Sequence, residues 1–227
     1  MNSTVESQTN PPDSLAERRE TLLDLLRQAG VHDARVLQAI RNVPREQFVA
    51  PALRAQAYAN IALPLEYGQS ISQPLMVAMM TQALGLTGTE SVLEIGTGSG
   101  YQAAILAQCA RSVVTIERWP GLAERAARLL GALGYTNVEV HIGDGTLGWP
   151  PAAPYDAILV TAAAPSVPEP LVAQLRLHGR LVVPVGSPEQ QDLLLVVKQE
   201  HGLEQRALGI CVFVPLIGAA AWRERFD

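Results

Sequence analysis

The stretch VLEIGTGSGY, residues 92–101, decides the fold of this 227-residue chain. An aliphatic run over residues 91–95 meets three glycines at alternate positions, and a helical pattern, AAILAQCA, follows them. This order predicts a strand, a tight glycine turn and a helix. Glycine places no Cβ atom between the backbone and a ligand, and the first N–H groups of the helix point over the turn. The stretch therefore indicates a ligand site at the end of a strand.

Acidic residues stand at the ends of three consecutive predicted strands. Glu94 precedes the first glycine by two residues. Glu117 ends the next apolar run, and Asp144 lies between two glycines after the third. Ligands of open α/β sheets bind at the carboxyl ends of the strands, so these acids are expected on one rim. An acid beside the turn suits a cationic amino-acid group, whereas the other two can meet ribose hydroxyls and an adenine amino group.

The order EIGTGSG, residues 94–100, differs from the dinucleotide fingerprint G-x-G-x-x-G because its third glycine comes one residue early. It resembles the first motif of the class I S-adenosylmethionine-dependent methyltransferases. The resemblance implies a Rossmann-like fold and S-adenosyl-L-methionine as cofactor, with the methionine end of the cofactor over residues 96–100. A G-x-S-x-G nucleophile elbow is disfavoured, since Thr97 and Tyr101 stand where that motif needs glycine.

The composition narrows the classes of function. Seventeen basic against 22 acidic residues give a net charge of −5 without a cluster of five like charges, so nucleic acid is not expected as a partner. Cys109 and Cys211 lie in apolar surroundings without CxxC spacing, which predicts buried thiols in a reducing compartment. The four histidines lack metal-binding spacing, so no metal site is expected.

The start of the chain shows no targeting signal. Residues 1–13 are polar and contain Pro11-Pro12, with neither a basic n-region nor an apolar h-region, and are predicted to be a disordered tail. No run approaches the roughly 20 apolar residues that span a bilayer. We therefore expect a cytoplasmic chain that does not bind a membrane and acts as a monomer.

The rest of the chain divides into an N-terminal helical cap with a substrate loop, residues 14–80, and an α/β domain, residues 81–227, which form one compact unit. The cap either covers core surface or builds the substrate's side of the pocket. Alternating β and α segments predict a doubly wound, mainly parallel sheet, and the short link between the last two strands predicts an antiparallel edge hairpin. Helices are expected over 14–29, 33–40, from 75 onward, 103–110, 120–130 and 167–177, the last one ended by His178-Gly179, and strands over 91–95, 113–116, 138–142, 156–160, 181–185, 193–197 and 208–214.

The first predicted helix carries its own start and stop signals. Ser14 and Glu17 have the spacing of a capping box, and Gly30 follows the last helical residue. Its apolar face is predicted to consist of Leu15, Leu22, Leu26 and Ala29.

A second informative stretch, NIALPLEYGQSISQP, occupies residues 60–74. Composition alone marks a polar loop between prolines, with Pro74 suited to the first turn of the next helix. Taken in order with VPREQFV (43–49), HIGDG (141–145), YDAILVTAAAP (155–165) and FVPL (213–216), it resembles the protein-L-isoaspartate O-methyltransferases. The resemblance covers residues 14–218, and GQSISQP is specific to that family.

This resemblance implies a protein or peptide substrate that contains L-isoaspartate, whose free α-carboxylate accepts the methyl group. The ester then cyclises to a succinimide without the enzyme, which starts repair. Ser72 matches the family's active-site serine and is expected to orient the carboxylate without forming a covalent intermediate. Ser70 stands where the family often has threonine, and Val212 where some relatives carry arginine. The residues expected to bind the cofactor are Ser70, Ile71, Ser72, Glu94, Gly96, Thr97, Gly98, Ser99, Gly100, Glu117, Gly143, Asp144 and Gly145.

Two other functions stay open on sequence grounds. The cofactor half alone would also serve an RNA or small-molecule methyltransferase. A nucleoside-binding module that senses S-adenosylmethionine without transferring its methyl group would need the same half. The excess of acidic over basic residues argues against an RNA substrate, and the loop around Ser72 argues against a non-catalytic binding module.

Overall fold

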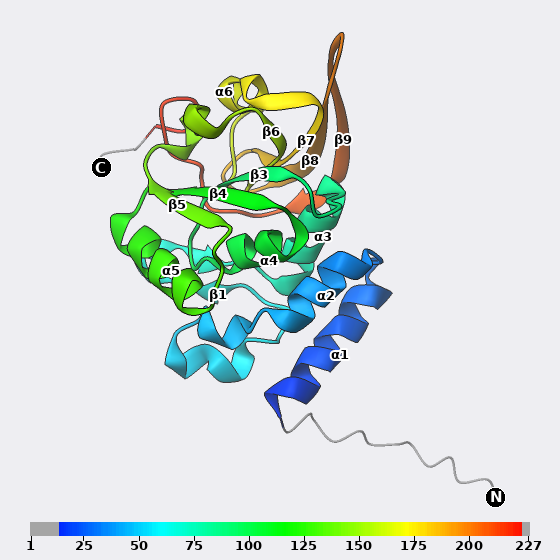
Figure 1. Ribbon diagram of the computed structural model, residues 1–227, viewed down its shortest axis with the longest axis vertical. Helices are drawn as coiled ribbons and strands as arrows, with labels where there is room; N and C mark the ends of the chain where they lie inside the picture. Colours follow the sequence, from blue (N-terminus) through cyan, green and yellow to red (C-terminus); the bar gives the residue numbers. More distant parts are fainter. Residues whose placement is uncertain (1–13, 224–227) are drawn as a thin grey trace, which may run out of the picture.

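A seven-stranded sheet in the order β5-β4-β3-β6-β7-β8-β9 forms the centre of the computed structural model, which describes residues 14–223 (Figure 1). The predicted tail over residues 1–13 lies outside the described residues. Neighbouring strands from β5 to β7 are parallel, and β8 pairs antiparallel with both β7 and β9. The mainly parallel sheet and the edge hairpin are therefore confirmed. The strands are β3 (Ser91–Ile95), β4 (Ser112–Glu117), β5 (Val138–Ile142), β6 (Tyr155–Val160), β7 (Leu175–Gly186), β8 (Gln191–Gln199) and β9 (Gly202–Cys211).

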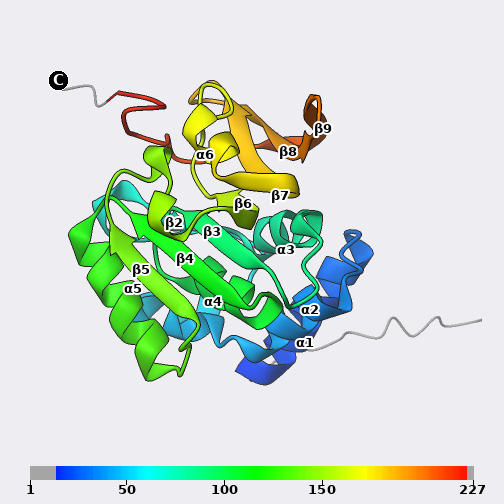
Figure 2. The same ribbon diagram turned by 45° about the horizontal axis from the view of Figure 1, so that its top comes forward.

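Helices cover both faces of this sheet, but unequally: α3, α4 and α5 lie on one face and α6 on the other (Figure 2). Successive side chains of a strand point to opposite faces, so Val92 of β3 joins the core on the α4 side and Leu93 the core on the other. The helices are α1 (Leu15–Gln28), α2 (Ala34–Asn42), α3 (Pro74–Leu84), α4 (Tyr101–Cys109), α5 (Pro120–Ala132) and α6 (Glu169–Ala173), with 3₁₀ turns at Arg45–Gln47, Pro51–Gln56, Glu66–Gly68, Gly145–Leu147 and Pro150–Ala152.

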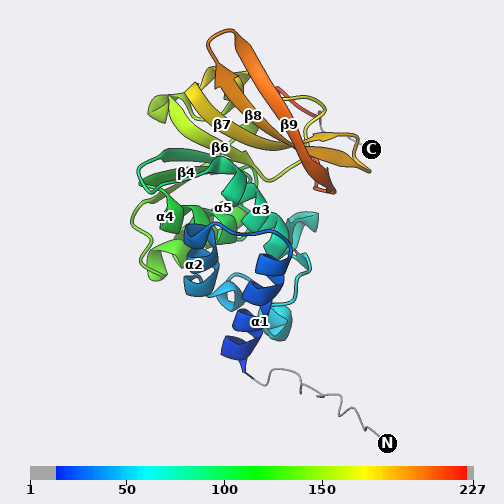
Figure 3. The ribbon, with the colours of Figure 1, turned by 90° about the vertical axis from the view of Figure 1, so that its right-hand side faces the viewer.

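The N-terminal cap packs beneath the face that α3 and α4 cover (Figure 3). One buried cluster contains Leu23 of α1, Ile40 of α2 and Ile105 of α4, so the cap and the sheet share a core. Helix α3 crosses the predicted boundary at residue 80, and this boundary stays a prediction. Within the cap, β1 (Leu63–Pro64) pairs with β2 (Ser70–Ile71), a hairpin that the polar composition of this segment did not predict.

Helix α1 begins as predicted, with the reciprocal hydrogen bonds of a capping box between Ser14 and Glu17. Its buried face differs from the prediction. Leu15, in the first turn, and Ala29, at the C-cap, are exposed because they lie at the ends of the helix. The buried residues are Leu22, Leu23 and Leu26.

The prediction of a helix over 167–177 was wrong in its second half, since β7 begins at Leu175. Leu175 pairs with Tyr155, and the register then shifts before Arg180 pairs with Ala157. His178, with φ 62°, lies in this irregular part of the strand. A left-handed residue before glycine occurs at helix ends and in β-bulges alike, so His178-Gly179 is compatible with either structure.

The last strand was also misplaced, since β9 occupies residues 202–211 rather than 208–214. It pairs with β8 directly after the turn, from Gly202 opposite Gln199 to Cys211 opposite Gln191. Beyond Cys211 the chain leaves the edge and crosses the carboxyl end of β6. There the Ala163 N–H donates to the carbonyl of Val214 at 2.8 Å. The apolar FVPL segment has strand-like composition but forms this crossing instead.

The corrected face of α1 can be tested by its effect on stability. Leu23 is 0% exposed and Leu25, in the same helix, is 40% exposed. Leu23→Ala should lower the free energy of unfolding by about 2–5 kcal/mol, because it leaves a cavity in the shared core. The matched control Leu25→Ala should change it by less than about 1 kcal/mol. Urea unfolding followed by circular dichroism measures both, and equal losses would contradict the assigned face.

Candidate functional site

The glycine turn after β3 is fixed by a close contact with the end of β6. Gly96 has φ 95°, and a Cβ atom there would clash with Oγ1 of Thr161. The same hydroxyl donates to the carbonyls of Ile95 at 2.9 Å and Gly96 at 2.7 Å. Only glycine permits this approach. Because the sheet order reverses between β3 and β6, the contact lies at the position where ligands of open α/β sheets bind.

Glu117, at the end of β4, holds the other side of the turn. Its Oε2 accepts the N–H of Gly98 at 2.9 Å, and its Oε1 accepts the N–H of Trp119 at 3.0 Å. The side chain is largely buried, with 5% of the residue exposed, yet it lines a cavity over the turn. A carboxylate has about four lone-pair sites, so Glu117 can accept further hydrogen bonds from a ligand.

The cavity over the turn has a volume of about 70 Å³ and combines this carboxylate with apolar walls. The walls come from the ends of three neighbouring parallel strands and from the FVPL crossing. Five residues predicted from the sequence lie together here: Ser70, Gly96, Gly98, Glu117 and Gly145. The structure adds Gln69, Ile95, Ile116, Arg118, Thr161, Ala162, Val214, Pro215, Leu216 and Ile217.

Asp144 lies beside this cavity and faces a neighbouring hollow that Gly143 and Ile217 also line. Its Oδ1 accepts the N–H and the hydroxyl of Thr146, at 2.9 and 2.6 Å. Its Oδ2 accepts the N–H of Ala219 at 2.8 Å. The carboxylate therefore joins the loop after β5 to the C-terminal segment, for which no role was predicted.

Four predicted residues lie beneath the turn and do not line the cavity. The Thr97 hydroxyl contacts that of Thr115 at 2.7 Å, and Gly100 allows α4 to approach α5. Ser99 accepts the N–H of Tyr101 at 3.2 Å. Glu94 is 0% exposed, and burial raises the pKa of its carboxyl to about 8; Thr115 opposes this shift and the charge of Glu117 adds to it.

A second cavity, of about 280 Å³, surrounds Ser72. Within the described chain, no hydrogen bond engages the Ser72 side chain, and no Asp, Glu, His, Lys or Arg lines this cavity. Burial raises the pKa of Cys211, the ionisable group in its wall, to about 11. Ile71, predicted with Ser72, is buried in the core instead. The lining residues are Ala62, Ser70, Ser72, Gln73, Met76, Thr161, Ile210, Cys211, Val212, Phe213 and Val214.

Ser70, Thr161 and Val214 line both cavities, so the two spaces meet at these residues. Sequence reasoning missed Thr161 and Val214, although each lies in a quoted motif. Thr161 directly follows β6, so the rule that placed the three acids at strand ends could have found it. Val214 belongs to a segment that was predicted to be a strand.

The loop that carries Ser72 is held by hydrogen bonds from both sides. Asn60 Oδ1 accepts the N–H of Leu75 in the first turn of α3 at 2.9 Å. The buried Arg45 donates through Nε to the carbonyl of Ala57 at 2.8 Å. Pro74 occupies the first turn of α3, as predicted. The cap therefore fixes the position of Ser72 as well as covering the core.

Comparison with known proteins identifies relatives over nearly the whole chain. The sequence model of the family described as protein-L-isoaspartate(D-aspartate) O-methyltransferase matches residues 17–221. The protein-L-isoaspartate O-methyltransferase of Methanoculleus marisnigri is 52% identical over 91% of this chain and 94% of its own length. Protein-L-isoaspartate O-methyltransferase 1 of Syntrophobacter fumaroxidans is 54% identical over 85% and 90%, respectively.

Solved structures agree with these relatives. A protein-L-isoaspartate O-methyltransferase structure has a TM-score of 0.81 and 32% identity, and the match covers 89% of this chain and 67% of the other. A Plasmodium falciparum protein in complex with S-adenosyl-L-homocysteine has a TM-score of 0.75 and covers 88% and 98%. At 22% identity, the second likeness concerns the fold alone.

No helix of residues 14–223 is long and apolar enough to cross a bilayer.

The raised pKa of Glu94 predicts a pH-dependent stability. The folded state keeps a proton that the unfolded state releases above about pH 4.5, so stability should fall as pH rises toward 8. Relative to Glu94→Gln, the wild type should lose at most about 1.4 kcal/mol per pH unit. Urea unfolding of both proteins at pH 5.5, 6.5 and 7.5 measures this difference. A difference that does not change with pH would show that Glu94 ionises normally.

Proposed function

The chain belongs to the protein-L-isoaspartate(D-aspartate) O-methyltransferase family, and we propose how its own residues carry out the reaction. It is an S-adenosylmethionine-dependent enzyme that methylates the free α-carboxylate of L-isoaspartyl residues in damaged proteins and peptides. The relatives support this activity over an RNA or small-molecule methyltransferase and over a non-catalytic binding module.

The observation that carries our assignment of the site is the meeting of the two cavities at Ser70, Thr161 and Val214. The cavity over the glycine turn takes the cofactor, which supplies an electrophilic methyl group on a positively charged sulfur. The cavity around Ser72 takes the acceptor carboxylate. Since transfer needs the reacting atoms in line at about 3 Å, a shared wall is the arrangement that the reaction requires.

The cofactor cavity fits a nucleoside with an amino-acid tail. Gly96 and Gly98 leave the backbone open to close approach, and Glu117 can accept the ribose hydroxyls. Asp144 is placed to meet the adenine amino group, although its oxygens already accept the N–H groups of Thr146 and Ala219. A cavity of about 70 Å³ is small for such a ligand, but Arg118 and Ile217 also line the neighbouring hollow that Asp144 faces, so the adenosine end can extend into that hollow.

The fully buried Glu94 lies outside the cavity lining, and we assign it an indirect role beneath the turn. Thr115 lowers its pKa and contacts the hydroxyl of Thr97, but neither carboxylate oxygen of Glu94 has a hydrogen-bond partner among residues 14–223. We propose that Glu94, Thr97, Ser99 and Gly100 support the turn on which the cofactor lies. Ile71 supports the Ser72 loop from the core in the same way.

The role that we propose for Ser72 in the acceptor cavity is to orient the carboxylate. An α-carboxylate has a reference pKa of about 3.3–3.7 and is ionised at neutral pH, so no proton has to be removed. The absence of acidic and basic side chains around Ser72, within the described chain, agrees with this requirement. The hydroxyl of Ser72 donates to one carboxylate oxygen and leaves the other to attack. Catalysis is then alignment and exclusion of water.

We further propose that the enzyme acts as a monomer in the reducing cytoplasm, without nucleic acid. The two described cysteines, Cys109 and Cys211, are free and buried, which suits a reducing compartment.

Replacement of Glu117 tests the cofactor site. Glu117→Ala should weaken S-adenosylmethionine binding by about 1.5–3 kcal/mol, the usual contribution of hydrogen bonds to a charged group. The matched control Glu124→Ala, on the exposed side of α5, should bind as the wild type does. Isothermal titration calorimetry measures both affinities, after circular dichroism has established that both variants fold. Unchanged affinity in Glu117→Ala would rule out the ribose assignment.

Replacement of Ser72 tests the acceptor site. Ser72→Ala should lower kcat roughly ten- to hundredfold, because the carboxylate loses a charge-assisted hydrogen bond that aligns it. Cofactor affinity should stay within about twofold of the wild type. Methyl incorporation into an isoaspartyl peptide, beside its aspartyl twin as blank, measures the rate. Full activity of the variant, or a covalent adduct on Ser72 in the wild type, would contradict this role.

A further inference from the structure

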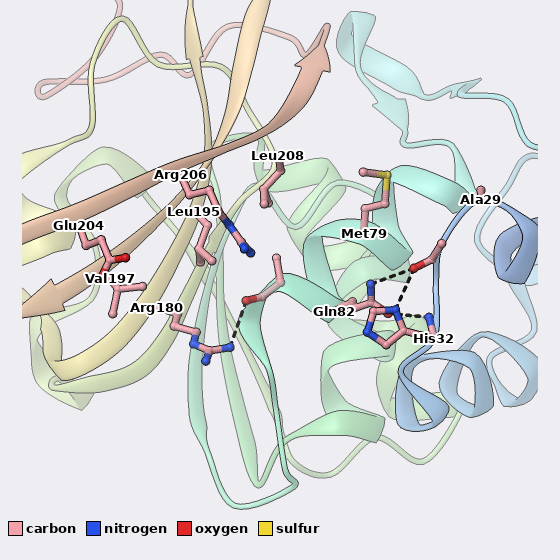
Figure 4. A pocket seen from close by; sticks show the side chains of 12 residues that line it. Ala29, His32, Met79, Gln82, Arg180, Leu195, Val197, Glu204, Arg206 and Leu208 are labelled. Carbon is pink, nitrogen blue, oxygen red and sulfur yellow. Dashed lines mark hydrogen bonds between the residues drawn. The ribbon is translucent and has the colours of Figure 1, made fainter.

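Next to the acceptor cavity the described chain has a larger cavity, of about 480 Å³, between α3 and the strands β8 and β9 (Figure 4). We call it the distal groove. Its floor is the partly covered face of β8 and β9, with Leu195, Val197 and Leu208. One wall is α3, with Met79, Gln82 and Ala83, and the rim carries Ala29, Gly30, His32, Arg180, Glu204 and Arg206.

The distal groove continues the acceptor cavity along both of its walls. On α3, Met76 lines the acceptor cavity and Met79, almost one turn further, lines the groove. On β9, Cys211 lines the acceptor cavity and Leu208 the groove. Gly209 lies between them, where a Cβ atom would meet nothing within 4 Å. The two spaces therefore lie end to end between the helix and the edge strand.

The groove is basic, although the whole chain carries a net charge of −5. Arg180 and Arg206 are exposed, and neither pairs with a carboxylate within 4 Å among residues 14–223. Arg180 donates through Nη1 to the carbonyl of Ala83 at 3.4 Å, which orients its guanidinium toward α3. Figure 4 shows the Arg206 guanidinium pointing from β9 toward α3 and the Arg180 guanidinium beside the C-terminal end of α3. Glu204, the acidic group of the rim, accepts a hydrogen bond from Gln199 at 3.2 Å.

We propose that the distal groove binds the polypeptide chain that flanks the isoaspartyl residue of the substrate, and that Arg180 and Arg206 favour acidic side chains there. This inference rests on the proposed function of the Ser72 cavity. A protein substrate must continue beyond its reacting residue, and the groove is the adjoining space with apolar contacts and unpaired cations. An occupant with apolar residues and a carboxylate complements it.

The length of α3 sets where the acidic residue should lie. The helix rises about 1.5 Å per residue, so its course from Pro74 to Ala83 spans about 14 Å. An extended chain covers about 3.3 Å per residue. The preferred carboxylate therefore lies about four to five residues from the isoaspartate.

The experiment compares three isoaspartyl peptides. One is a tripeptide that fills only the acceptor cavity. The other two are eleven-residue peptides with a central isoaspartate. On each side of it, the fourth and fifth residues are both glutamate in one peptide and both lysine in the other. Methyl incorporation gives kcat/KM for each peptide with the full-length wild type. The acidic peptide should be preferred over the basic one by about three- to tenfold, mainly through KM, as expected for two exposed ion pairs.

Variants assign this preference to the groove. Arg206→Ala and the double variant Arg180→Ala/Arg206→Ala should reduce the preference stepwise, and Arg206→Glu should reverse it. The tripeptide should be methylated equally by all variants. The matched control Arg128→Ala, on exposed α5, should keep the wild-type preference.

The tripeptide separates the two proposals. If it is methylated but the two long peptides react alike, or if the preference survives in both arginine variants, the groove assignment is overturned and the proposed function stands. If no peptide is methylated, both are overturned. A loss of activity on the tripeptide in Arg206→Ala would also overturn the inference, because it would indicate a structural role instead.

Discussion

The close contact between Gly96 and Thr161 is the constraint on which the rest of the site depends. The Thr161 hydroxyl bonds the carbonyls of Ile95 and Gly96, and no Cβ atom fits between them. This fixes the turn after β3 against the end of β6, at the place where the sheet order reverses. Thr161 also lines both cavities. The packing of the Thr161 side chain against the Gly96 backbone therefore sets how the two cavities that we propose for methyl donor and acceptor lie relative to each other.

Three acids that look alike in the sequence differ because their strands lie at different places in the sheet. Glu94 belongs to β3, which has β4 and β6 on either side, and its carboxyl is fully buried. Glu117 ends β4 one step outward and reaches the cavity while it holds Gly98. Asp144 follows the edge strand β5, where the C-terminal segment takes up one of its oxygens. Distance from the sheet centre therefore decides whether each carboxylate is buried in the core, lines the cavity or anchors a loop.

The sequence could predict the features that depend on local patterns, and it could not predict those that depend on contacts between distant residues. The parallel strands and capped helices depend on local patterns, and Gly96, Gly98 and Glu117 follow from the strand-end rule. What failed depends on contacts between distant residues: Leu175 joins a strand because Tyr155 lies beside it, and residues 213–216 leave the sheet because Ala163 offers them a partner. Local composition is equally compatible with either outcome. Val214 could not be placed in the site for the same reason.

The sequence left open whether the N-terminal cap only covers core surface or builds the substrate's side of the pocket; the contacts show the first role and support our proposal of the second. Leu23 and Ile40 complete the core, whereas Ala62, Ser72 and Gln73 line the acceptor cavity. These roles are linked through Arg45, which is buried over the ring of Tyr101 at 4.8 Å and donates to the chain that leads to Asn60. Asn60 in turn holds the start of α3. A buried cation without a carboxylate partner is costly, and burial lowers the pKa of Arg45. Its hydrogen bonds to the carbonyls of Ala57 and Ile61 tie the start of the Ser72 loop to the core, so the position of Ser72 depends on the same packing that stabilises the fold.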